Sequence, residues 1–149
     1  NIKKILLLYR THEEQASRQR QEEQLKIKDD IRKRQFLALD IHPTEHEIIL
    51  HRSLCASKGA DTPEELTDMG RWLNKISVGN AKHSQYDQNK LENVLSERWF
   101  IACYSSANKL GMSAWSFFWA QSLSRGFRLV LRNIIRIAKF FFKSRVPRS

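Results

Sequence analysis

The sequence predicts an all-α protein, a small helical bundle with a long charged N-terminal helix and a basic amphipathic C-terminal helix. Three observations support this fold class. Apolar residues recur at intervals of three and four along most of the 149-residue chain, and no segment shows the alternation of a half-buried strand. Residues that cap helices precede several of these stretches. Hydrophobic residues make up 41% of the chain, so it can bury a core and is not a disordered polycation.

Residues 1–39 form the first predicted unit, a charged helical arm. From His12 to about Leu39 helix-forming residues dominate, and acids often precede bases by four positions, which stabilises a helix by about 0.2–0.5 kcal/mol per pair. Apolar residues are nearly absent between His12 and Leu25, so we expect the first half of this helix to lie in solvent or to bind a protein partner. An apolar stripe that could dock on the core begins at Leu25 and continues through Ile27, Ile31, Phe36, Leu37 and Leu39.

Residues 40–111 form the second predicted unit, the helical core. His42-Pro43 marks its first boundary, because proline disfavours helix in the residue before it and suits the first turn of a new helix. The helix that begins near Pro43 is expected to end at Gly59, since glycine often follows the last residue of a helix.

The next two predicted helices have clear start signals. Asp61-Thr62-Pro63 supplies a capping oxygen and a proline at the first helical position. We expect this helix to end before a loop at Val78–Gln85, which contains Gly79-Asn80. Asp87 then caps a helix that runs to Gly111.

Residues 112–149, the third predicted unit, carry most of the net charge of +10. They hold eight basic side chains and no acid, which leaves only +2 for the other 111 residues. The unit begins with an uncharged aromatic half around Trp115, and Gly126 is expected to kink the chain before the basic half. Six cations of the basic half follow one another at intervals of three or four, so they share one stripe of a helix: Arg125, Arg128, Arg132, Arg136, Lys139 and Lys143. The opposite side is apolar, and the residues expected to insert or dock are Phe127, Leu131, Ile134 and Phe141.

Three interpretations of this last helix follow. In the favoured one, the protein is a non-enzymatic accessory protein that docks on an anionic membrane surface or a membrane-associated complex, with the cations facing lipid head groups. In the second, the cations bind the phosphates of a nucleic acid, as in a ribonucleoprotein subunit. In the third, the helix completes the bundle and its charges face water.

Chemistry-bearing residues give little support for an enzyme. Histidines and carboxylates cluster between Asp40 and His51, but His46 and His51 are one position too far apart for the zinc-binding pattern HExxH. No nucleotide-binding loop or nucleophile motif is present, so we predict no catalytic, cofactor-binding or metal-binding residues, and a small metal-dependent enzyme is the least favoured alternative. Cys55 and Cys103 lack CxxC spacing, which favours free thiols in a reducing compartment.

Overall fold

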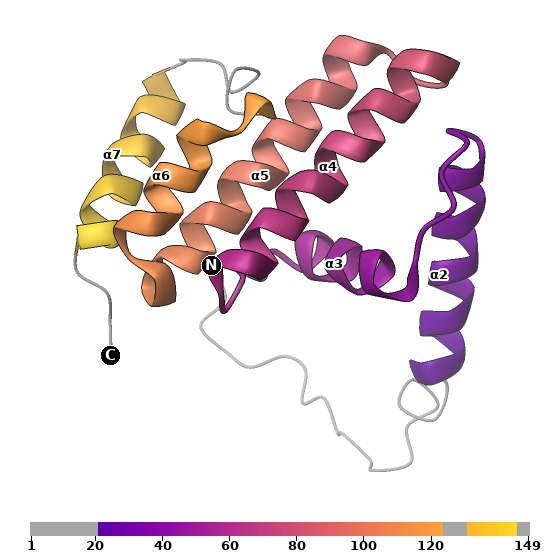
Figure 1. Ribbon diagram of the computed structural model, residues 1–149, viewed down its shortest axis with the longest axis horizontal. Helices are drawn as coiled ribbons and strands as arrows, with labels where there is room; N and C mark the ends of the chain where they lie inside the picture. Colours follow the sequence, from indigo (N-terminus) through magenta and orange to yellow (C-terminus); the bar gives the residue numbers. More distant parts are fainter. Residues whose placement is uncertain (1–20, 124–130, 146–149) are drawn as a thin grey trace, which may run out of the picture.

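The computed structural model describes residues 21–123 and 131–145, and within these ranges every regular element is a helix. The helices are α2 (Gln21–Leu37), α3 (Glu45–Cys55), α4 (Pro63–His83), α5 (Gln88–Leu110), α6 (Met112–Ala120) and α7 (Leu131–Arg145). The predicted all-α class is confirmed. In Figure 1, α4, α5, α6 and α7 lie side by side, and α2 stands at the opposite end of the molecule from α7. The predicted helix before Gln21 and the predicted kink at Gly126 lie outside the described residues.

Local capping explains where three helices begin. Thr44 caps α3 through a reciprocal pair of hydrogen bonds: its Oγ1 accepts from the amide of Glu47 at 3.2 Å, and its own amide donates to the carboxylate of Glu47 at 2.8 Å. Thr62 caps α4, with Pro63 as its first residue. Asp87 caps α5 by accepting from the amide of Lys90 at 2.8 Å. These starts agree with the sequence predictions to within two residues.

The predicted helix end at Gly59 is wrong. Helix α3 already ends at Cys55, and Gly59 lies in the following loop against the backbone of α5. A Cβ atom on Gly59 would lie 2.6 Å from the carbonyl carbon of Ser105 and 2.9 Å from Cα of Ser106. Gly59 therefore allows the loop after α3 to lie close to the backbone of α5, and it does not cap a helix.

The predicted loop at residues 78–85 is also wrong, because α4 continues to His83. Gly79 lets the helix pack closely on Ile41, whose Cδ1 would be 2.8 Å from a Cβ at this position. Asn80 is buried, and its side chain both donates to the carbonyl of Tyr86 at 2.9 Å and accepts from the amide of Tyr86 at 2.8 Å. Gly79 and Asn80 therefore belong to α4, and Asn80 stabilises the turn that follows this helix by its hydrogen bonds to Tyr86.

Within the described part of the arm, the C-terminal half of α2 joins the core. Ile27 and Ile31 of α2 are 55% and 51% exposed, so the predicted apolar stripe does not dock along its whole length. Contact begins at Asp29, which is 6% exposed and forms an ion pair with Arg52 of α3. Hydrogen bonding from Arg52 lowers the pKa of this carboxyl. Phe36 then enters the core, and its ring meets the edge of Trp72 with centroids 5.0 Å apart.

Where α2, α3 and α4 meet, burial holds a histidine neutral. The indole nitrogen of Trp72 donates to Nδ1 of His51 at 3.3 Å, and the ring of Phe36 packs edge-on at 5.0 Å. Loss of solvent is the main reason that the pKa of His51 falls from 6.5 to about 4, and the positive charges of Arg32 and Arg98 add to the effect.

We therefore expect the free energy of unfolding to fall by about 2 kcal/mol between pH 7 and pH 5. Because the folded-state pKa of His51 is depressed, the unfolded chain binds the proton first; the stabilisation is complete above pH 6.5 and is lost as the pH falls towards 4. Urea unfolding at pH 7, 6 and 5 measures this loss. The carboxyls of Asp29 and Glu47 lose their own stabilisation only below about pH 4.5, outside this range.

The matched variant is His51→Gln, which keeps a side-chain acceptor for Trp72 but cannot titrate. Its free energy of unfolding should vary less between pH 7 and pH 5 than that of the wild-type protein. An equal dependence in the two proteins would show that His51 is not the group responsible.

Candidate functional site

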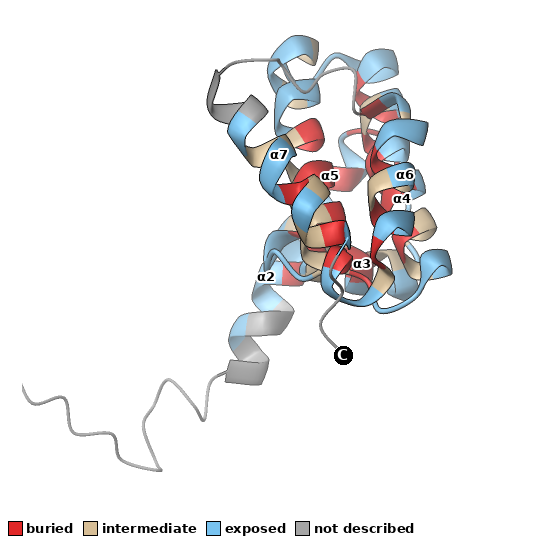
Figure 2. Ribbon diagram, turned by 90° about the vertical axis from the view of Figure 1, so that its left-hand side faces the viewer, coloured by how far each residue is buried: buried red, intermediate tan, exposed pale blue. Residues whose placement is uncertain are grey.

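Helices α6 and α7 form one end of the bundle, where the sequence predicted the functional surface. Both helices pack on α5 and on each other. Gly111 separates α5 from α6 with φ 54° and ψ −133°, a conformation that suits glycine. The carbonyl of Phe118, near the end of α6, accepts a hydrogen bond from the indole nitrogen of Trp99 at 3.2 Å. Figure 2 views this end of the molecule, with the buried residues of α7 turned towards the other helices.

Phe140 anchors α7 to the bundle and is completely buried. Its ring lies edge-on to Trp115, Phe100 and Phe118, with centroids 5.2, 5.8 and 6.0 Å away. Such aromatic pairs contribute about 0.5–1.5 kcal/mol each beyond the burial of their area. Ser144, one turn later, is also buried and donates to the carbonyl of Phe140 at 2.9 Å. The sequence placed Phe140 to Phe142 together on the side expected to contact a membrane, and the burial of Phe140 in the bundle was not predicted.

The six cations of the predicted stripe do not all face away from the protein. Arg136 donates to the carboxylate of Glu97 at 2.7 Å, and its guanidinium lies 4.6 Å from the ring centroid of Phe100. Lys143 donates to the carbonyl of Tyr104 at 2.7 Å, and its ammonium lies 4.0 Å from the centre of that ring. Both side chains thus pack against α5, which differs from the predicted orientation.

The remaining predicted site residues fall into three groups. Lys139 is exposed, and Phe141 is half-buried beside Trp115, with ring centroids 5.4 Å apart. Leu131, Arg132 and Ile134 belong to the first turns of α7. Arg125, Phe127 and Arg128 lie outside the described residues.

An exposed surface runs over the outer sides of these two helices, and we call it the α6–α7 surface. It consists of Met112, Ser113, Ser116, Trp119 and Ala120 of α6 and Ile135, Ala138, Lys139, Phe142 and Arg145 of α7. Ile135 and Phe142 are 52% and 69% exposed, and Trp119 is 46% exposed. The surface contains no carboxylate, and the chain has no Asp or Glu after Glu97.

The aromatic residues of this surface, Trp119 and Phe142, are joined by two half-buried rings, Trp115 and Phe141, into a continuous row. Trp119 contacts Trp115 with centroids 5.7 Å apart, Trp115 contacts Phe141 at 5.4 Å, and Phe141 contacts Phe142 at 5.9 Å. The guanidinium of Arg145 lies 4.4 Å from the ring of Phe141, so a cation adjoins the row. Large apolar groups and positive charges therefore occupy the same face.

The histidine-rich segment does not form a second site of this kind. His42 and His46 are exposed, each near one carboxylate: Asp40 at 3.9 Å and Asp68 at 3.5 Å. His51 instead points into the core beside Trp72. Among the described residues, no three His, Cys, Asp or Glu side chains gather closely enough to hold a metal ion.

Both cysteines of the chain are free. Cys103 is fully buried, and burial raises the pKa of its thiol. Cys55 is exposed, with its Sγ 3.4 Å from Nε2 of His51. The two thiols therefore differ strongly in their access to solvent.

No family model matches the chain, and no curated protein or solved structure matches it either. In the described residues, none of the helices has the length and apolar character needed to cross a bilayer. The class of protein therefore rests on the fold alone. It is an all-α protein in which a buried cluster of aromatic rings around Phe140 holds α7 on the bundle.

Proposed function

We propose that this chain is a non-enzymatic accessory protein that docks on an anionic membrane surface through the α6–α7 surface, facing a reducing compartment. The observation that supports this function most is the combination of exposed Trp119, Ile135 and Phe142 with exposed cations and no carboxylate on one face. Aromatic and aliphatic side chains favour the boundary between head groups and acyl chains, and lysine and arginine favour anionic head groups.

The way α7 is held also suits this function. Phe140 and Ser144 attach the inner side of the helix to the bundle, so its outer side can contact lipid without any loss of the core. Arg136 and Lys143 are engaged with α5, which leaves Lys139 and Arg145 as the exposed cations on the described part of α7. The favoured partner is lipid and not a nucleic acid, because phosphate binding would use these cations but leave the apolar side chains in water.

Binding to lipid vesicles tests the proposal. The full chain is expected to float with phosphatidylcholine vesicles that contain 30% phosphatidylserine and to bind vesicles of phosphatidylcholine alone much more weakly. Lys139→Gln/Arg145→Gln should weaken binding to the anionic vesicles about 30-fold, because each cation near an anionic surface contributes about 1 kcal/mol. The single variant Phe142→Asp should abolish most of the binding to anionic vesicles, since it places a carboxylate where the side chain meets the head groups.

Two matched variants control for charge and hydrophobicity elsewhere on the protein. Lys58→Gln/Lys82→Gln matches the change in net charge of the double variant, but at exposed positions outside the α6–α7 surface. Ile49→Asp matches Phe142→Asp, because it replaces an apolar residue that is 54% exposed on α3. Both should bind vesicles like the wild-type protein. Equal losses in test and control variants would contradict a defined surface. Salt-sensitive binding to duplex DNA or RNA without vesicle binding would favour the nucleic-acid alternative instead.

A further inference from the structure

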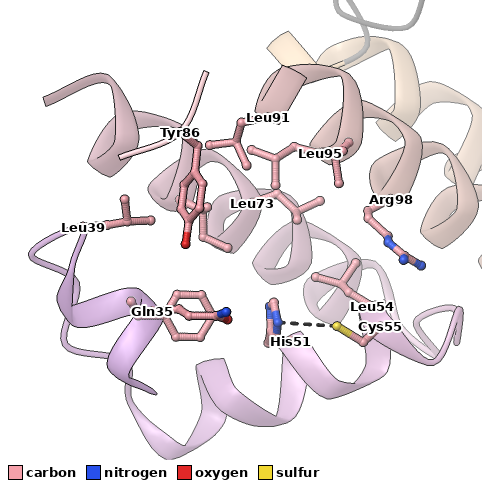
Figure 3. Close-up of a pocket in the computed structure, with 13 residues that line it drawn as sticks. Gln35, Leu39, His51, Leu54, Cys55, Leu73, Tyr86, Leu91, Leu95 and Arg98 are labelled. Carbon is pink, nitrogen blue, oxygen red and sulfur yellow. Dashed lines mark hydrogen bonds between the residues drawn. The ribbon is translucent and has the colours of Figure 1, made fainter. Parts of the chain in front are cut away.

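A second candidate site lies on the α2 side of the bundle, away from the α6–α7 surface. It is a partly open pocket of about 280 Å³ between α2, α3, α4 and α5, and Figure 3 shows the residues that line it. Its walls are mostly aliphatic and aromatic, as is usual for sites that bind small molecules. Leu54, Leu73 and Leu95 are among the buried side chains that line it.

The pocket contains one charged residue, Arg98 of α5, and no carboxylate. Arg98 makes no hydrogen bond or ion pair with another described residue, whereas Arg52 and Arg136 each pair with an acid. Figure 3 shows Arg98 at the same end of the pocket as Leu54 and Cys55, with Gln35 and Tyr86 at the other end. A positive charge without an anion therefore adjoins an apolar space.

His51 adds polarity to the pocket wall without adding charge. Because Trp72 donates to Nδ1, the ring proton lies on Nε2, which faces Sγ of Cys55 at 3.4 Å. The lowered pKa of His51, about 4, keeps the imidazole neutral at physiological pH. An anionic ligand would thus meet a single cation, Arg98, at one end of a mostly apolar wall.

We propose that this pocket binds a small monocarboxylate with an aliphatic body, its carboxylate paired with Arg98 and its chain against Leu54, Leu73 and Leu95. Charge complementarity favours one negative charge, because a second would have no partner among the lining residues. The volume equals that of about nine water molecules at ~30 Å³ each, which suits a ligand of about ten non-hydrogen atoms. Octanoate has this size and serves as the probe.

Calorimetric titration of the full chain with octanoate tests the site. The wild-type protein should bind octanoate, and Arg98→Gln should weaken that binding about 10–100-fold, the range expected for loss of a charge-assisted hydrogen bond. Octan-1-ol, which has the same chain without the charge, should bind both proteins equally weakly. Arg71→Gln, which removes an exposed arginine outside the pocket, should leave octanoate binding unchanged.

Alkylation of Cys55 tests whether the ligand binds in this pocket. Octanoate should slow the reaction of iodoacetamide with exposed Cys55 at the pocket wall, while buried Cys103 stays unreactive as an internal reference. No binding by the wild-type protein, equal binding by Arg98→Gln, or binding without protection of Cys55 would each overturn the proposal. Phe142→Asp should bind octanoate normally, so failure of the pocket and failure of the membrane surface are distinguishable.

Discussion

Replacement of Phe140 by alanine is expected to lower the free energy of unfolding by about 3–5 kcal/mol, the largest effect that we predict for a single side chain. Phe140 is fully buried and meets rings from both α5 and α6, so its removal leaves a cavity that four bulky aromatic neighbours cannot close. Because Phe140 and Ser144 are the fully buried residues of α7 in the described part of the chain, the loss should also loosen this helix.

Chemical denaturation followed by tryptophan fluorescence measures the effect, since Trp115 lies against the Phe140 ring. Phe142→Ala is the matched control: it makes the same substitution two residues later on the same helix, where the ring is 69% exposed, and should change stability by less than about 0.5 kcal/mol. A similar loss in both variants would contradict the view that Phe140 holds α7 in place. In the vesicle experiment, by contrast, Phe142 is the residue under test, because it belongs to the proposed docking surface.

Gly59→Ala is expected to cost about 3 kcal/mol or more, although Gly59 lies in a loop. A Cβ atom would collide with the backbone of Ser105 and Ser106, and backbone atoms inside a helix cannot move aside as a flexible side chain can. Moving the loop away would also break the hydrogen bond from the amide of Ala60 to Oγ of Ser106, which is buried and 2.8 Å long. The buried amide would then lack a partner.

The same substitution at Gly70 provides the comparison. A Cβ atom there would approach only the side chains of Trp99 and Gln121, at 3.2–3.4 Å, and alanine favours the helix interior by about 1 kcal/mol over glycine. Thermal unfolding should therefore rank Gly59→Ala well below Gly70→Ala in stability. Equal midpoints would show that the loop can shift away from α5 without loss.

Much of the helical architecture follows from local sequence. The starts of α4 and α5 could be predicted because a capping side chain and the amide that it binds are only three residues apart. The start of α3 was predicted from Pro43, two residues before its first helical residue, and its cap Thr44 was not predicted. The end of α5 at Gly111 was predictable for a similar local reason. Gly59 and Gly79 misled the prediction, because each glycine is needed for contact with a segment far away in the chain, which no local pattern reveals.

The pocket beside Arg98 could not be predicted at all. Its lining residues come from four helices and two of the turns between them, at positions spread from Gln35 to Arg98, so no spacing in the sequence connects them. His51 appeared in the sequence as part of a histidine cluster, yet the fold separates it from His42 and His46 and buries it against Trp72. Its neutral state is therefore a property of packing and not of composition.

Helix α7 shows what the sequence predicts and what the tertiary structure adds. The sequence alone predicted a basic, amphipathic helix here, because cations and apolar residues recur with the period of a helix, and the structure confirms the helix over Leu131–Arg145. Only the tertiary structure determines which side packs inwards: α5 provides a carboxylate for Arg136 and a carbonyl for Lys143, and its aromatic rings surround Phe140. Long basic side chains can pack their stems on a core when an acceptor receives the charge, so positive charge by itself does not define the solvent-facing side.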